Sequence, residues 1–124
     1  MSKDIVADAL NQITNALKSG KKEVFVKRYS KFLLSILAIG KLKEYIEDYR
    51  IEGNTLRISI NKLNKCGAIK PRYLVKSDEI EEYISRYLPS KYLGTIVIST
   101  SKGLMTHQTA IEKKIGGSLI AYFY

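Results

Sequence analysis

Three hydroxyl residues, Ser99, Thr100 and Ser101, follow one another where an apolar run of the sequence ends. The surrounding stretch reads ISTSKGLMTH, from Ile98 to His107. Hydroxyl groups at such a point can be solvated loop residues, act as a nucleophile, or exchange hydrogen bonds with a bound molecule. The other features of the sequence show which of these three interpretations is favoured.

A serine nucleophile needs a base beside it, and the sequence offers a single histidine, His107. It follows Thr106, a typical helix N-cap, so we expect its imidazole to be exposed to solvent and non-catalytic. No Gly-x-Ser-x-Gly motif surrounds any serine. A small hydrolase that uses Ser101 is therefore the least favoured interpretation, and we expect the protein not to be an enzyme.

The composition gives no support for a metal, a cofactor or a membrane. One histidine and one cysteine, Cys66, cannot form a zinc cluster, and a lone cysteine cannot form an internal disulfide, which fits a reducing compartment. The longest apolar stretch, FLLSILAIG, is far shorter than the roughly 20 residues that span a bilayer. We expect a soluble cytoplasmic protein with no metal site, no cofactor and no membrane partner.

The charge balance favours a polyanionic partner. The 124 residues include 21 Lys and Arg against 12 Asp and Glu, which gives a formal net charge of +9 and a pI near 9.6. Residues 1–63 carry 12 basic and 7 acidic side chains, and residues 64–124 carry 9 and 5, so both halves are basic. A surplus of this size attracts nucleic acid or an anionic membrane surface.

Basic residues adjoin aromatic ones in VFVKRY, KPRY and SRYLPSKY, a pattern that suits irregular RNA. Lysine and arginine can contact phosphates, and tyrosine rings can stack on unpaired bases. Most of the nine tyrosines are expected to line the core, so only Tyr73 is predicted to bind RNA. For the hydroxyl run, an RNA contact and a purely local role in a strand-to-helix loop are equally open at this point.

Apolar spacing predicts two helices and three strands in the first half of the chain. Positions three and four residues apart from Val6 to Leu17 make one helical face with Asp4 as N-cap, and Ser30 can cap a second helix. EVFVKR alternates in the manner of a short strand. EYIEDYRI and TLRISI flank a turn at Gly53 and are expected to pair as a hairpin.

The second half is predicted to run strand, helix, strand, helix, strand. Ser77 is expected to cap the first of these helices, and GTIVIS is the clearest strand of the chain. Thr106 is expected to cap the last helix, which Gly116 and Gly117 would end. SLIAYFY then closes the chain as a strand.

This element order predicts an α+β fold of two small α/β modules packed together. Residues 1–63 form the helix-strand-helix-hairpin module, and residues 64–124 form the strand-helix-strand-helix-strand module. The boundary lies in a polar, basic stretch with a glycine and a proline, NKLNKCGAIKPRY. If the hydroxyl run contacts RNA, the C-terminal module is the one that recognises it, because the run is there.

The hydroxyl run and the glycine pair carry a resemblance to a known family. STSKGLMTH followed by KKIGGSLIAYFY closely resembles the C-terminal signature of the small-subunit ribosomal protein eight family. DIVADALNQITNAL is similar to its opening helix, the Ser30–Lys31 pair to the start of its second helix, and NKCGAIKPRY to its archaeal and eukaryotic branch. The resemblance extends from about Asp4 to Tyr124, nearly the whole chain.

The resemblance implies a structural protein of the small ribosomal subunit that binds the central domain of the small-subunit rRNA and helps its assembly. Neighbouring small-subunit proteins are the other implied partners, with the chain a monomer within a cytoplasmic ribosome. The C-terminal loop would contact an irregular, partly unpaired RNA helix. The residues that we expect to contact RNA are Asn15, Ser30, Lys31, Arg72, Tyr73, Ser99, Thr100, Ser101, Lys102, Gly103 and Thr106.

Three positions depart from the pattern of the relatives. Thr109 stands where many relatives have a glutamate, so a capping box with Thr106 is lost and the last helix should start less firmly, by up to about 1 kcal/mol. Ile111 replaces an arginine of many relatives, and Ser118 replaces an acid of bacterial ones.

The alternative function is an RNA-regulatory protein that represses translation of its own message.

Overall fold

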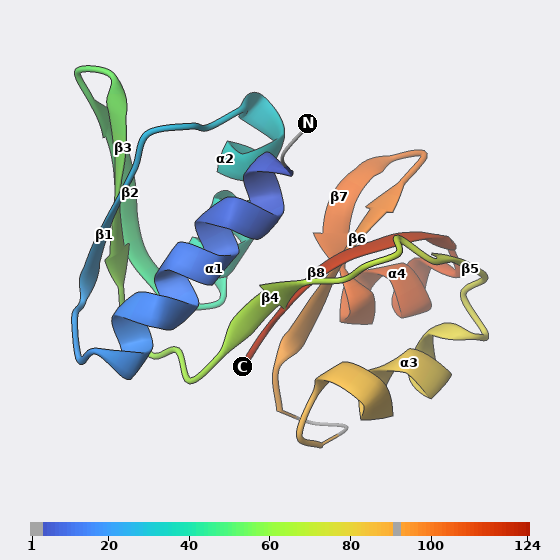
Figure 1. Cartoon of the computed structure of the whole chain (residues 1–124). Helices are drawn as coiled ribbons and strands as arrows, with labels where there is room; N and C mark the ends of the chain where they lie inside the picture. The colour runs from blue at the N-terminus through green and yellow to red at the C-terminus, as the bar shows by residue number, and fades with distance from the viewer. Residues whose placement is uncertain (1–3, 91–92) are drawn as a thin grey trace. The chain divides into compact units, whose positions relative to one another are not determined.

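The computed structural model describes residues 4–90 and 93–124 (Figure 1). The chain divides into two compact units, Met1–Gly67 and Ala68–Tyr124. The described residues form four helices and two antiparallel sheets, which confirms the predicted α+β class. None of these helices is long and apolar enough to cross a membrane.

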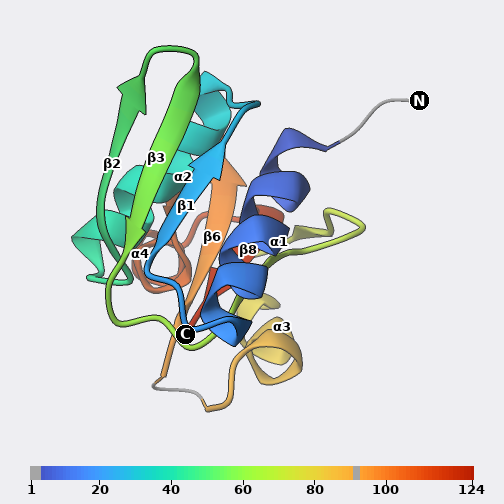
Figure 2. The same cartoon turned by 60° about the vertical axis from the view of Figure 1, so that its left-hand side comes forward.

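The first unit combines two helices with a three-stranded sheet. Its elements are α1 Ile5–Lys18, β1 Glu23–Val26, α2 Lys31–Leu42, β2 Ile46–Glu52 and β3 Thr55–Ile60. The strand order is β1-β3-β2, with antiparallel pairing throughout. Both helices lie on the same face of this sheet (Figures 1 and 2). The order of elements is the predicted one.

Side-chain caps start both helices of this unit at the predicted residues. Asp4 Oδ1 accepts hydrogen bonds from the backbone N–H groups of Val6 at 3.0 Å and Ala7 at 3.2 Å. Ser30 Oγ accepts the N–H of Leu33 at 3.2 Å. Such bonds satisfy amides that the first helical turn leaves unpaired, and each contributes about 1 kcal/mol.

The β2–β3 hairpin also confirms its prediction. Gly53 has a φ of +65° in the turn, a conformation in which a Cβ would be strained. Along β3, Leu56, Ile58 and Ile60 are buried and alternate with partly exposed residues. This period of two gives the sheet one apolar face and one polar face.

The second sheet has five strands. The remaining elements are β4 Cys66–Ala68, β5 Leu74–Val75, α3 Ile80–Tyr87, β6 Thr95–Thr100, β7 Gly103–Thr106, α4 His107–Lys113 and β8 Gly117–Phe123. The strand order is β4-β8-β6-β7, and β5 pairs with β8. Neither β5 nor β7 is predicted from the sequence, whereas α3, α4, β6 and β8 are.

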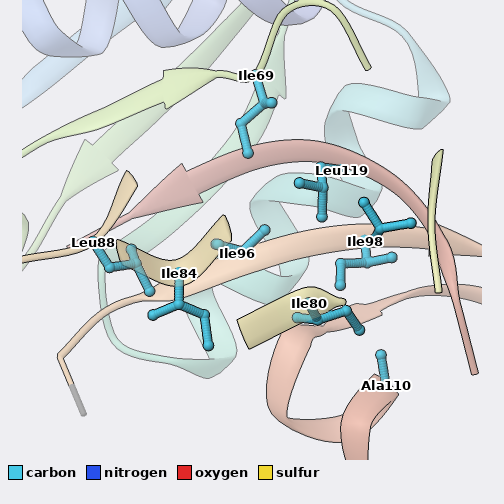
Figure 3. Close-up of a cluster of buried hydrophobic side chains, with 9 residues drawn as sticks. Ile69, Ile80, Ile84, Leu88, Ile96, Ile98, Ala110 and Leu119 are labelled. Atoms are coloured by element: carbon cyan, nitrogen blue, oxygen red, sulfur yellow. The ribbon is translucent and has the colours of Figure 1, made fainter. Parts of the chain in front are cut away.

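Helices α3 and α4 bury their apolar sides against β6 (Figure 3). Ile80 and Ile84 of α3 and Ala110 of α4 lie in one cluster with Ile96 and Ile98 of β6, and all five side chains are buried. Because neighbouring side chains of a strand point to opposite faces, Ile96 and Ile98 lie on the same side of the sheet. This cluster fixes the strand from which the hydroxyl run extends.

The predicted cap of α3 is wrong. The helix begins at Ile80, after a turn that includes Ser77, and its N-cap Glu79 makes no side-chain capping bond. Glu79 instead reaches back, since its Oε1 accepts the backbone N–H of Lys76 at 2.8 Å. The Glu79 carboxylate thus serves an amide that precedes the helix, and no side-chain cap serves the amides of its first turn.

The predicted end of α4 is also wrong. Lys114, with a φ of +57°, terminates the helix, and not the two glycines that follow. A Cβ on Gly116 would collide with the Val75 carbonyl, and one on Gly117 would collide with the Ser99 carbonyl. The glycines are required because β8 begins in close contact with the backbones of β5 and β6.

Candidate nucleic-acid interface

The hydroxyl run lies at the end of a β-hairpin and not in the strand-to-helix loop that the sequence predicts. Strands β6 and β7 pair antiparallel, with Ser99 opposite Leu104 and Thr100 opposite Gly103. The chain reverses at Ser101 and Lys102, as the orange hairpin of Figure 1 shows. We call residues 101–103 the hairpin tip.

Thr100 holds the hairpin tip in shape. Its hydroxyl donates to the Gly103 carbonyl at 2.8 Å and accepts the backbone N–H of Lys102 at 3.1 Å. Gly103 has a φ of +106°, which glycine adopts without strain. One of the three hydroxyls therefore has the local role that the sequence left open, and it stabilises the turn.

The two serines that flank Thr100 are differently placed. Ser101 is exposed together with Lys102 and Gly103, and Ser99 is half-buried. Within residues 4–90 and 93–124, neither serine hydroxyl has a hydrogen-bond partner. Both can therefore donate and accept bonds with a bound molecule.

Beside the hairpin tip, the surface is hollowed into an open depression of about 520 Å³. Its polar lining comes from three segments, namely the end of β5, the end of β6 and the turn before β8. We call it the lysine depression and define it by Lys76, Ser77, Ser99, Ser101 and Lys114. No carboxylate is among the described residues that line it. It is thus a cationic, hydroxyl-rich surface that is open to solvent.

Arg72 and Tyr73 precede β5, in the same unit. Arg72 is exposed, and Tyr73 is half-buried, with its ring centroid 5.3 Å from that of Tyr83. The Tyr73 carbonyl accepts the N–H of Leu119 at 2.9 Å, which fixes the backbone. The Tyr73 ring therefore contributes to packing, and it stays a prediction that the ring also stacks on a base.

The cap of α4 forms as predicted, but its hydroxyl is buried. Thr106 Oγ1 accepts the backbone N–H of Thr109 at 3.2 Å and lies 3.1 Å from the Thr109 hydroxyl. The side chain is only 6% exposed. A threonine pair thus replaces the capping box, and the geometry gives Thr106 a structural role.

The prediction that His107 is exposed is wrong. The residue is 2% exposed, and its Nδ1 accepts the backbone N–H of Ile96 at 3.0 Å. Strand β7 ends one residue earlier, so beyond it this amide of β6 needs another acceptor. The first residue of α4 is turned inward to supply it, and the imidazole is structural.

The N-terminal residues expected to bind RNA lie at separate places on the first unit. Asn15 is exposed near the end of α1 and lines a hollow with Lys21 and Phe25. Ser30 and Lys31 stand at the start of α2, and neither lines that hollow. Lys31 is exposed, and the Ser30 oxygen accepts its capping bond.

The polar face of the first sheet carries cations that are paired. Arg57 forms ion pairs with Glu23 and with Glu52, the latter at 3.8 Å. Arg50 contacts Asp48 at 3.0 Å, and Lys41 of α2 reaches the same carboxylate at 3.3 Å. We call the five strand residues of these pairs the charged sheet face.

The pKa values on the charged sheet face reflect this pairing. The hydrogen bond from Arg50, the Tyr49 backbone and Lys41 together hold the pKa of Asp48 below its usual value. By contrast, Lys76, Lys102 and Lys114 form no ion pair with any carboxylate of the described residues. The lysines of the lysine depression and of the hairpin tip therefore carry positive charge that no described carboxylate pairs with.

Comparison with known proteins agrees with this arrangement. The family model of ribosomal protein S8 matches residues 4–124. The chain belongs to the ribosomal protein S8 family. A curated relative, small ribosomal subunit protein uS8 of Nanoarchaeum equitans (strain Kin4-M), is 40% identical over 129 aligned residues, which cover 100% of both chains. The resemblance read from the sequence is confirmed, and this relative is archaeal.

The S8 family consists of structural ribosomal proteins, so the expectation that the chain is not an enzyme is confirmed. In this S8-family chain His107 is buried, and its imidazole is bonded to the Ile96 amide of β6. Among the described residues, no three His, Cys, Asp or Glu side chains are grouped as metal ligands would be.

The sequence did not predict that two lysines lie beside the hydroxyl run, in the lysine depression. Lys76 and Lys114 are far apart in the chain and meet the hydroxyl run only because β5 pairs with the start of β8. A two-residue strand has too few residues to show a period. The GG pair after Lys114 was the one available signal of a close backbone contact.

Proposed function

We propose that this S8-family chain binds the central domain of the small-subunit rRNA directly and helps that domain to assemble. It would act as a monomer within the small ribosomal subunit of the cytoplasm, beside neighbouring small-subunit proteins. The observation that carries the proposal is the hairpin tip, which presents a hydroxyl, an amine and bare backbone in a shape that Thr100 fixes.

Each exposed group of the hairpin tip has a chemical counterpart in RNA. The hydroxyl of Ser101, and that of the half-buried Ser99 next to the tip, can both donate and accept, so they can pair with a base edge or a ribose 2′-hydroxyl. Lys102 can contact a phosphate. Gly103 has no side chain that would keep an RNA strand away from the backbone. These contacts suit an irregular or partly unpaired RNA region, whose base edges are accessible.

The other expected contacts divide into supporting and excluded ones. Arg72 and Tyr73 would extend the surface on the second unit, and Asn15, Ser30 and Lys31 would add contacts from the first unit. Thr106 is not part of the proposed contact, because its hydroxyl is buried in the α4 cap. Thr100 would act indirectly, through the shape of the tip.

Footprinting of the full chain on naked small-subunit rRNA tests the proposal. We expect protection within the central domain and a clear preference for that domain over random duplex RNA. If four to six phosphates are contacted, log affinity should fall against log salt with a slope of roughly −3 to −5. Equal affinity for both RNAs, or protection outside the central domain alone, would contradict the proposal.

A further inference from the structure

The lysine depression has a floor without side chains. Gly116 and Gly117 line it, and their backbone lies directly against the carbonyls of Val75 and Ser99. A Cβ at either glycine would overlap one of these carbonyls, so the start of β8 can lie against β5 and β6 only with glycine at both positions. A ligand would meet two ammonium groups and hydroxyl groups beside this glycine floor and the exposed side chain of Leu74.

Lys114 has a backbone conformation that does not favour lysine. Its φ of +57° and ψ of +43° lie in the left-handed region, at a helix end where glycine is the usual residue. A lysine at this place makes the helix end less stable than a glycine would. Such a residue is worth a functional explanation, and its side chain lines the depression.

The charge of the depression is available to a ligand. Neither Lys76 nor Lys114 forms an ion pair with a carboxylate in the described part of the chain. The carboxylate of Glu79, near Lys76 in the chain, is bonded to the Lys76 backbone amide. Ser99 and Ser101 add hydroxyls without partners, as described above. Two cations and two free donors on one concave surface match a tetrahedral oxyanion.

We propose that the lysine depression binds one phosphate group of the RNA backbone, between the amines of Lys76 and Lys114 and the hydroxyl of Ser101. The inference rests on the proposed function and adds to it a phosphate subsite next to the hairpin tip. The bound phosphate sets the register of the RNA strand, so that the neighbouring nucleotide lies at the tip. Lys114 is a phosphate-binding residue, and its contact is independent of RNA sequence.

The substitution Lys114→Gly separates binding from folding. It removes the amine and also relieves the left-handed strain, so stability and RNA affinity should move in opposite directions. We expect a melting temperature higher by a few degrees and an affinity lower by about fivefold to tenfold. The slope of log affinity against log salt should flatten by up to about 1. Lys114→Arg keeps the charge and should keep the affinity.

The chain offers a matched control in Glu44, which has a φ of +68° at the end of α2. Glu44→Gly relieves the same kind of strain on a residue far from the depression in the chain. It should raise the melting temperature without loss of RNA affinity. Equal loss of affinity in Glu44→Gly and Lys114→Gly would overturn the phosphate subsite.

Each protein is measured with the rRNA central domain and with random duplex RNA, and its preferred phosphates are mapped by ethylation interference. The inference predicts loss on both RNAs, and one phosphate whose ethylation weakens binding of the wild type but not of Lys114→Gly. Unchanged affinity and an unchanged ethylation pattern in Lys114→Gly would overturn it. A wild type that binds both RNAs equally contradicts the proposed function alone, because the loss at Lys114 is then still measured on either RNA.

Discussion

The charged sheet face and the lysine depression both carry cationic side chains, yet they use them in opposite ways. On the charged sheet face, Arg50 and Arg57 have carboxylate partners. In the depression, Lys76 and Lys114 have none among the described residues. The presence of cationic side chains alone does not distinguish the two surfaces. Pairing does, because a cation already in an ion pair gains less from a phosphate than an unpaired one.

The same contrast holds for nucleophilic and hydroxyl groups. Cys66 is 2% exposed, and its thiol lies near the Leu10 carbonyl and the Thr14 hydroxyl. Burial raises its pKa to about 11, although the Thr14 hydrogen bond opposes the shift. The hydroxyl of Ser101 is exposed and without a partner among the described residues. The first unit buries the Cys66 thiol, and the second unit exposes the Ser101 hydroxyl to solvent.

The largest effect is expected at the glycine floor of the depression. In Gly117→Ala, the added Cβ would overlap the Ser99 carbonyl and force β6 and β8 apart. We expect a loss of about 3 kcal/mol in the free energy of unfolding, measured by urea denaturation. Ser118→Ala, at the next and half-buried position, should change it by less than about 0.5 kcal/mol. Equal costs would mean that the close contact does not matter.

A second test removes one exposed hydroxyl. Ser101→Ala should weaken binding to the rRNA central domain by about 1 to 3 kcal/mol, since an RNA polar group is left unpaired. The melting curve should barely change, because the side chain is exposed at the hairpin tip. Ser35→Ala, at an exposed position of α2, is the control and should leave RNA binding unchanged. A lower melting temperature with unchanged specificity would make Ser101 a structural residue.

The buried thiol gives a prediction in pH. The folded pKa of Cys66 lies above the usual value of 9.0, so the unfolded thiol ionises first as the pH rises. Its contribution to stability is complete below pH 9 and decreases toward pH 11, by about 2 kcal/mol. Unfolding free energies of the wild type and Cys66→Ala over pH 8 to 11 check this. Parallel curves for the two proteins would contradict the predicted effect of burial on the Cys66 thiol, because every other titrating group is common to both.

The smallest expected effect compares a paired cation with an unpaired one. Lys102→Ala should weaken specific and random RNA alike and flatten the salt slope by up to about 1. Arg57→Met removes the same unit of charge from the charged sheet face and should flatten the slope less, because Glu23 and Glu52 already neutralise it. Equal changes in slope for the two variants would show that pairing is irrelevant and only net charge counts.

Local patterns predicted those parts of the fold whose determinants lie close together in the chain. The Asp4 and Ser30 caps bond to amides two or three residues away, and the turn at Gly53 joins adjacent strands. Strand β7 is different, because it has only four residues and no run of β-branched ones. It is defined by its pairing with β6. A nonlocal pairing of that kind has no periodic signal.

The site was predictable in the residues that form it and not in their surroundings. The run Ser99–Ser101 was found from its composition, and its position at a hairpin was not. His107 follows a capping residue, which predicts exposure. Its side chain is buried because the Ile96 amide, which has no acceptor on β7, donates to its Nδ1. Lys76 and Lys114 enter the site through the short β5–β8 pairing. Each miss concerns a contact between segments distant in the chain.

The two hydrogen bonds of the Thr100 hydroxyl have a kinetic consequence. Because both bonds are present in the free protein, the hairpin tip does not have to fold when it binds RNA. Association is then governed by diffusion and by the attraction between lysines and phosphates, and it should slow as salt is added. Differences among RNA sequences should appear in how long each complex lasts, because base contacts at the tip are broken only on departure.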